Sequence, residues 1–152
     1  MENTLISLRI THRTISIAVF RGMQLEYARV RNLPSQRDKM ESTLRGYIHW
    51  AAGMFGANSA AIEMPETDKG NLTAQLHKAA LEVLRELTMA VCETDKTELF
   101  AAFAIPPMLK RSGIRKIVTR IWPTLDDNDG NVLNQDAAAL GLYAQTERLL
   151  QH

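Results

Sequence analysis

Ile6-Ser-Leu-Arg-Ile-Thr-His-Arg-Thr-Ile-Ser-Ile-Ala-Val-Phe20 is the stretch that decides the fold. On either side of its polar centre, Thr11-His12-Arg13, residues 4–10 and 14–20 alternate or run apolar and β-branched, as β-strands do. A link this short favours an antiparallel hairpin. A glycine-containing turn then leads into residues 25–30, which predict a third strand. We therefore expect the chain to start with a three-stranded meander.

Helical and strand patterns alternate further along the chain. Ser35 is the expected N-cap of a helix that runs to about Phe55, and Asp38 lies in its first turn. The other expected elements are strands at 59–63 and 89–93 and helices at 72–87, 110–122 and 136–150. Residues 97–107 give no clear assignment. This order predicts a single α/β domain over residues 1–152, with a mixed five-stranded sheet flanked by helices.

The composition suits a soluble globular domain of 152 residues, with 45 % hydrophobic and 23 % charged residues. The formal net charge of +1 does not identify a nucleic-acid binder, so an electrostatic argument must rest on local clusters. Cys92, the single cysteine, excludes an internal disulfide and a thiolate zinc site, and we expect it to be a small core residue. No apolar stretch reaches the roughly 20 residues of a membrane span. We expect a cytoplasmic protein without a membrane partner.

Two acidic residues stand at the ends of expected elements. Glu63 ends the apolar strand Ala60-Ala61-Ile62, and Asp136 opens the closing helix. Both have ordinary interpretations: Glu63 as a solvated loop acid, and Asp136 as an acid that favours the positive end of its helix. Arg9, near the end of the first strand, is in the same way consistent with an exposed sheet face.

Basic residues gather in the helix at 110–122. Lys116 and Arg120 would share one helix face, and Arg111 and Arg115 another. Such charges can neutralise phosphates, although a solvated helix face and a plain hairpin turn are the competing interpretations. The candidate nucleic-acid contacts are His12, Arg13, Lys69, Lys110, Arg111, Arg115 and Lys116.

Three aromatic residues, Tyr47, Trp50 and Phe55, follow a helical stripe. We interpret them as core or dimer contacts rather than as base-stacking platforms. The four histidines show no HxxxH or HExxH spacing, and the chain has no Walker A loop and no GxGxxG motif. The sequence therefore gives no indication of a zinc, nucleoside-triphosphate or dinucleotide site.

The order of elements and acids resembles the RNase H-like superfamily, and within it the RuvC Holliday-junction resolvases. Four stretches carry the resemblance: the opening hairpin, Ala60-Ala-Ile-Glu-Met-Pro65, the basic segment 109–121, and Asp136-Ala-Ala-Ala-Leu-Gly-Leu-Tyr143. The resemblance implies that Glu63 matches the acid of the fourth strand and that Asp136 matches the last acid of the closing motif. It places Arg9 where the first-strand Asp belongs.

The family pattern is incomplete in this chain. Leu133 takes the position of a further acid, and Ile10 and Thr11 replace the Pro and Gly that follow the first Asp. The family cleaves phosphodiesters with two Mg²⁺ ions, which prefer carboxylate oxygens from converging elements. An arginine in the middle of such a site repels Mg²⁺ and can pair with both acids. We therefore expect Arg9 to disrupt a metal site formed by Glu63 and Asp136.

Other readings of the site stay open. The alignment can be shifted, or Glu66, Asp126, Asp127 or Asp129 can supply missing ligands. An active Mg²⁺-dependent nuclease would then use Glu63 and Asp136 as catalytic metal ligands, with Lys110 or Lys116 near the scissile phosphate. The Asp126–Gly130 segment lacks the spacing of a calcium loop and is typical of a flexible turn.

Three functional hypotheses follow. The first is a RuvC-like nucleic-acid-binding protein with impaired cleavage, whose partner is DNA, in particular branched DNA. The second is an active structure-specific endonuclease, and the third is a non-catalytic scaffold or regulatory protein, because fold does not fix function. The resemblance also implies a homodimer, for which the apolar face of residues 40–55 or 72–87 is a candidate interface.

Overall fold

The structure is a computed structural model that describes residues 3–65, 71–103, 110–125 and 133–150. Its strands are β1 (Thr4–Ile10), β2 (Thr14–Arg21), β3 (Gln24–Asn32), β4 (Ser59–Glu63) and β5 (Ala90–Thr94). Its helices are α1 (Arg37–Phe55), α2 (Asn71–Glu86), α3 (Lys96–Ala102), α4 (Lys110–Ile121), the short 3₁₀ helix η2 (Pro123–Leu125) and α5 (Leu133–Leu150). No helix in these described segments is long and apolar enough to cross a membrane.

The five strands form one mixed sheet in the order β3-β2-β1-β4-β5. β1, β2 and β3 are the expected antiparallel meander, and β4 joins β1 in parallel, with Leu8 beside Ile62. The mixed five-stranded sheet predicted from the sequence is therefore confirmed. Because β1 and β4 are parallel, their carboxyl ends lie at the same edge of the sheet. Arg9 and Glu63 are thus brought together by strand pairing alone.

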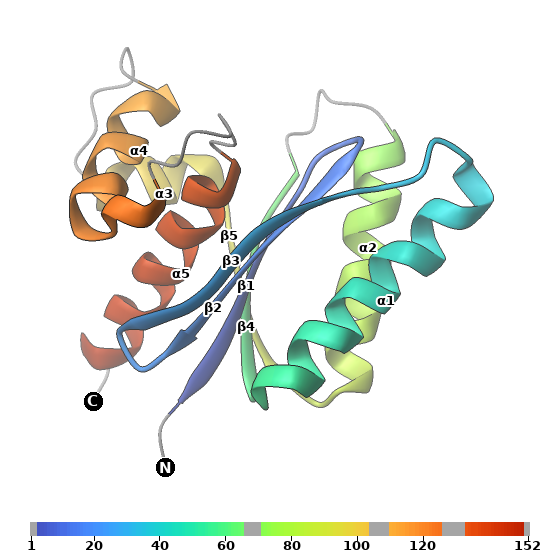
Figure 1. The fold of residues 1–152 in the computed structure, drawn as a ribbon, viewed down its shortest axis with the longest axis horizontal. Coiled ribbons are helices and arrows are strands. Elements are labelled where there is room, and N and C mark those ends of the chain that lie inside the picture. The colour runs from blue at the N-terminus through green and yellow to red at the C-terminus, as the bar shows by residue number, and fades with distance from the viewer. Residues whose placement is uncertain (1–2, 66–70, 104–109, 126–132, 151–152) are drawn as a thin grey trace.

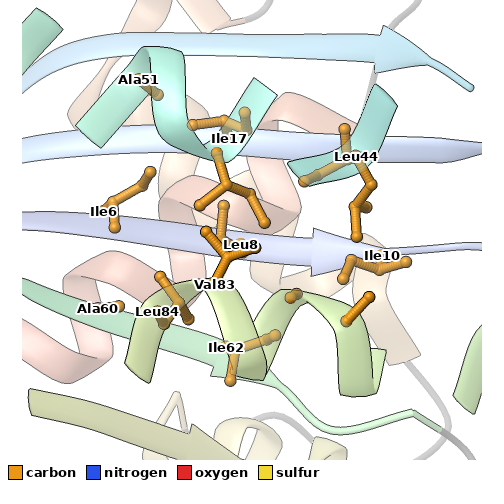
Figure 2. Packing of buried hydrophobic residues seen from close by; sticks show 14 of the residues in the cluster. Ile6, Leu8, Ile10, Ile17, Leu44, Ala51, Ala60, Ile62, Val83 and Leu84 are labelled. Atoms are coloured by element: carbon orange, nitrogen blue, oxygen red, sulfur yellow. The ribbon is translucent and has the colours of Figure 1, made fainter. Parts of the chain in front are cut away.

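Helices cover both faces of the sheet, with α1 and α2 on one side and α3, α4 and α5 on the other (Figure 1). The face toward α1 and α2 is built from alternate strand residues, such as Ile6, Leu8 and Ile10 of β1 (Figure 2). Since successive strand residues point to opposite faces, Ser7 and Arg9 must point toward α5. The Ser7 hydroxyl indeed donates a 2.7 Å hydrogen bond to the Ala137 carbonyl of α5.

Small residues allow α5 to lie close to the sheet. Ala137, Ala138 and Ala139 are fully buried in the second core. A Cβ added at Gly141 would overlap the ring of Phe20, so this position requires glycine. The Ala-rich sequence of α5 therefore sets the short distance that brings its first turn to the ends of β1 and β4.

Several local predictions are wrong. α1 begins after Gln36, which caps it without a side-chain hydrogen bond, so Ser35 is not the N-cap. α5 begins at Leu133, and Asp136 lies in its first turn rather than at its start. Cys92 is exposed rather than buried, because β5 is an edge strand.

Two helical surfaces also differ from expectation. The apolar faces of α1 and α2, considered as a dimer interface, are buried against the sheet through residues such as Leu44 and Val83. Helical spacing predicts that Ile121 shares the apolar face of residues 110–122 with Ile114 and Val118, but in α4 it is 48 % exposed while those two are buried. α3 was not predicted; Asp95 caps it by accepting a 2.8 Å hydrogen bond from the Glu98 amide.

Candidate functional site

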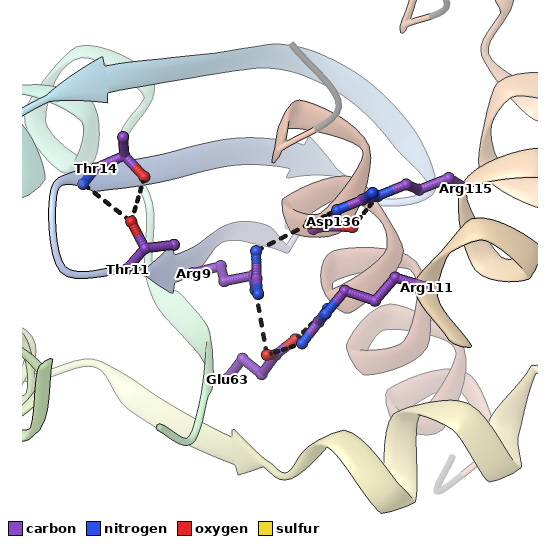
Figure 3. A network of polar contacts seen from close by, with 7 residues as sticks. All are labelled: Arg9, Thr11, Thr14, Glu63, Arg111, Arg115 and Asp136. Atoms are coloured by element: carbon purple, nitrogen blue, oxygen red, sulfur yellow. Dashed lines mark hydrogen bonds and ion pairs between the residues drawn. The ribbon is translucent and has the colours of Figure 1, made fainter. Parts of the chain in front are cut away.

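Arg9 bridges the two acids. Its Nε donates to Glu63 Oε2 at 3.3 Å, and its Nη1 donates to Asp136 Oδ2 at 3.0 Å (Figure 3). The carboxylate side chains are buried, with exposed fractions of 6 % for Glu63 and 1 % for Asp136, and that of Arg9 is 17 %. The expected pairing is therefore present. The alternative interpretations, a solvated loop acid and an arginine on an exposed sheet face, are wrong.

Two further arginines reach the same acids from α4. Arg111 binds Glu63 with both of its terminal nitrogens, Nη1 to Oε1 at 3.1 Å and Nη2 to Oε2. Arg115 binds Asp136 through Nε to Oδ1 at 2.9 Å and Nη2 to Oδ2 at 2.7 Å. Both pairs are bidentate, the geometry in which guanidinium and carboxylate interact most strongly. Arg111 and Arg115 are one helical turn apart, so a single face of α4 holds both acids.

The sequence predicted that Arg111 and Arg115 share one helix face and that this face binds phosphates. In the structure, this face of α4 points into the protein and binds Glu63 and Asp136. The signal that could have found this contact is the pair of acids itself, because buried carboxylates require nearby positive charge. Lys116 and Arg120, on the other side of α4, are exposed as expected.

The cluster has an excess of positive charge. Three guanidinium groups face two carboxylates, which leaves a formal charge of +1, and all four carboxylate oxygens accept hydrogen bonds from arginines. Mg²⁺ requires oxygen ligands that are not already paired with cations. Among the residues that the structure describes, no three His, Cys, Asp or Glu side chains are grouped to hold a metal ion. This donor set does not fit Mg²⁺.

A cavity of ≈ 550 Å³ opens next to the cluster. Arg9, Glu63, Arg115 and Leu133 line its inner side, and the β1–β2 hairpin tip, with exposed His12 and Arg13, lines its rim. The tip is held by the Thr11 hydroxyl, which lies 2.7 Å from the Thr14 hydroxyl and accepts a 3.1 Å bond from the Thr14 amide (Figure 3). The cavity is thus bordered by arginines and accessible from outside.

Of the remaining candidate site residues, the structure describes the side chain of Leu133 but not those of the others. Leu133 is the first residue of α5, where the family pattern has an acid, and it contributes an apolar side chain to the cavity. Lys69 and the alternative ligands Glu66, Asp126, Asp127 and Asp129 lie outside the described residues, as does the side chain of Lys110.

The aromatic stripe of α1 only partly matches its expected role. Tyr47 and Phe55 are half-buried and contact the core. Trp50 is 45 % exposed and is not a core residue.

The sheet order, the two helical layers and the meeting of β1, β4 and α5 define an RNase H-like fold of the RuvC type. Thermus thermophilus RuvC, solved in complex with a Holliday junction substrate, matches with a TM-score of 0.78 and 14 % identity over 97 % of this chain and 96 % of that chain. The yeast mitochondrial Holliday junction resolvase matches with a TM-score of 0.62 and 9 % identity over 93 % of this chain and 75 % of its own. The fowlpox virus Holliday junction resolvase matches with a TM-score of 0.60 and 10 % identity over 95 % of this chain and 99 % of that chain.

At these identities the likeness establishes the fold alone. No family model matches the chain, and no curated protein sequence matches it.

Proposed function

We propose that this protein binds branched DNA without cleaving it, and that the arginine cluster takes the place of the catalytic metal ions. The observation that carries the proposal is the bridge from Arg9 to Glu63 and Asp136, because it engages the acids that a RuvC-type nuclease would use for Mg²⁺. The RuvC-like fold, and the solved complex of one similar protein with a Holliday junction, support DNA as the partner.

Electrostatics favour a phosphate at the cluster. One phosphodiester carries one negative charge and would neutralise the formal excess of the three arginines. Arg9 lines the cavity, and Arg13 and His12 stand at its rim, so a backbone phosphate that enters there meets positive charge on two sides. Lys116 and Arg120 are exposed on the outer face of α4 and extend the positive surface. A homodimer, which would present two such sites to a junction, belongs to the proposal and is tested by light scattering.

The test is binding and cleavage of a labelled four-way junction and a linear duplex, at about 50 and about 200 mM salt. Each measurement is made with EDTA, with Mg²⁺ and with Mn²⁺. We expect salt-dependent binding that prefers the junction, is unchanged by EDTA, and is not followed by cleavage. Arg13→Gln and Lys116→Gln should each lower the slope of log K against log salt by about 0.9. Arg85→Gln, an exposed charge at the end of α2, is the matched control.

Two outcomes oppose the proposal. Metal-dependent cleavage that Glu63→Gln abolishes would establish an active nuclease. Absence of both binding and cleavage would favour the scaffold hypothesis.

A further inference from the structure

A second surface, on the α1 side of the sheet, combines the exposed ring of Trp50 and its half-buried neighbours Tyr27 and Phe55 with two arginines. Trp50 and Met54 of α1 are 45 % and 62 % exposed. The Tyr27 ring of β3 lies 5.7 Å from the Trp50 ring and 5.2 Å from that of Phe55, measured between centroids. The Trp50 and Phe55 rings meet edge to face at 6.4 Å. The three rings form one aromatic platform, with Trp50 as its outermost member.

Two arginines are organised around Tyr27. The Arg29 guanidinium lies over its ring, 5.9 Å from the centroid, and Arg31 donates to its hydroxyl at 3.3 Å. Alternate residues of a strand share a face, so Tyr27, Arg29 and Arg31 all stand on the α1 side of β3. Ala28, on the other side, is buried in the second core, which agrees with this assignment. Both arginines are exposed, and neither forms an ion pair with a described acid.

The strand register connects this surface with the cavity. Arg29 pairs with Ile17 and Arg31 with Ile15, so the two cations advance along the sheet toward the end at which the hairpin tip lies. There the Leu33 amide donates a 2.8 Å hydrogen bond to the Arg13 carbonyl. Arg13 lines the rim of the cavity. A row of positive charge thus follows β3 from the aromatic platform to the candidate site.

Aromatic rings beside a row of cations are the two features that bind single-stranded nucleic acid: bases stack on the rings, and phosphates meet the cations. We propose that the surface of Tyr27, Arg29, Arg31 and Trp50 binds a single DNA strand. A base stacks on Trp50, and the following phosphates lie along Arg29 and Arg31 toward the hairpin tip. This surface is separate from the arginine cluster and does not depend on its role.

The experiment follows Trp50 directly. The chain has two tryptophans, and Trp122→Phe leaves Trp50 as the single tryptophan reporter. An oligothymidylate of about 12 nucleotides, within the range of single-strand site sizes, is titrated into this variant, and fluorescence is recorded. We expect quenching that saturates. In parallel, the anisotropy of the labelled oligonucleotide gives the affinity of Trp50→Ala, which we expect to be about tenfold weaker.

Conservative and matched variants complete the design. Trp50→Phe retains a ring and should recover most of the affinity. Arg29→Gln with Arg31→Gln should lower the salt slope by about 1.4, at about 0.7 for each phosphate contact on a single strand, and Arg85→Gln should leave it unchanged. Thermal unfolding of each variant shows that it is folded. Arg9→Gln should leave oligothymidylate quenching in place, which separates this surface from the proposed phosphate site at the cluster.

Three outcomes would overturn the inference. The first is absence of quenching with an unchanged affinity of Trp50→Ala. The second is an equal loss of affinity in Arg85→Gln. The third is a change from dimer to monomer in Trp50→Ala without a change in oligonucleotide affinity, which would make the platform a contact between copies of the chain.

Discussion

Asp136→Asn tests whether the arginine cluster stabilises the fold. The substitution keeps the shape of the side chain and removes its charge. Asp136 is 1 % exposed and accepts bonds from Arg9 at 3.0 Å and from Arg115 at 2.9 and 2.7 Å. Asparagine retains one oxygen acceptor, but its amide nitrogen would face guanidinium donors. We therefore expect the variant to be less stable than the parent protein.

The magnitude follows from the burial of the pair. Removing one partner of a buried ion pair costs about 3–5 kcal/mol. The retained oxygen, and the partial exposure of the Arg115 side chain at 25 %, place the effect at the lower end, about 3 kcal/mol. For a chain of this size, 1 kcal/mol shifts the melting temperature by about 2–4 °C, so we expect a decrease of roughly 6–12 °C.

The assay is thermal and urea unfolding in EDTA, with Asp38→Asn as the matched control. Asp38 also lies in the first turn of a helix, but it is exposed. Its substitution removes the interaction of a carboxylate with the helix dipole, about 0.3–1 kcal/mol, without touching a buried pair. The difference between the two variants therefore isolates the contribution of the arginine bonds.

The sign of the effect decides between two kinds of site. Carboxylates gathered for a metal ion repel one another when the metal is removed, and neutralising one of them then stabilises the protein. If Asp136→Asn melts in EDTA at a higher temperature than the parent, or falls no further than Asp38→Asn, the arginines do not balance the acids as described.

Four further substitutions test the fold and the site. Gly141→Ala should lower the free energy of unfolding by about 1–3 kcal/mol, because the added methyl group overpacks against the Phe20 ring. Gly46→Ala has open space around it and should raise the free energy of unfolding by up to about 1 kcal/mol. Urea unfolding of both variants measures the two effects. Burial lowers the pKa of the His77 side chain, and the contact with Glu93 only partly offsets this effect. The folded protein therefore binds a proton at His77 less readily than the unfolded chain does. The free energy of unfolding should fall as the pH drops through about 6.5, the ordinary pKa of histidine. Urea unfolding at about pH 7.5 and about pH 5.5, on either side of that value, should show a smaller loss in His77→Gln, and an equal loss would refute the assignment. Arg9→Asp leaves two arginines facing three acids; its melting temperature should rise on adding Mn²⁺, and a rise of equal size in the parent protein would contradict the proposed role of Arg9.

The sequence predicted the parts of the fold that depend on local patterns. Alternation in residues 4–20 identified the hairpin, because one face of each strand is mostly apolar, as Ile6, Leu8 and Ile10 show in β1. The position of Arg9 beside both acids was predicted from the resemblance to the RuvC family, and the parallel pairing of β1 with β4 explains why it lies next to Glu63. α3 was missed because its seven residues are too few to show a helical period.

The features that were missed depend on how elements dock. From its sequence, a basic helix is expected to face solvent. Only its position over the sheet shows that Arg111 and Arg115 bind buried acids. Cys92 was assigned to the core because apolar strand residues are usually buried, but β5 lies at the sheet edge. Trp50 was predicted to belong to an aromatic stripe that packs on the core, but Leu44, Ile48 and Ala51 form the buried face of α1 and Trp50 lies beside that face, 45 % exposed.

The identity of one side chain on β1 changes what the same two acids do. β1, β4 and α5 meet at one edge of the sheet, through the pairing of β1 with β4 and the hydrogen bond from Ser7 to Ala137. An acid at that position would create a cluster of negative charge that requires metal ions. Arg9 instead supplies the positive charge from within, and Glu63 and Asp136 become anchors for Arg111 and Arg115. α4 is thereby held over the site, and its outer face, with Lys116 and Arg120, is available to DNA under the proposed function.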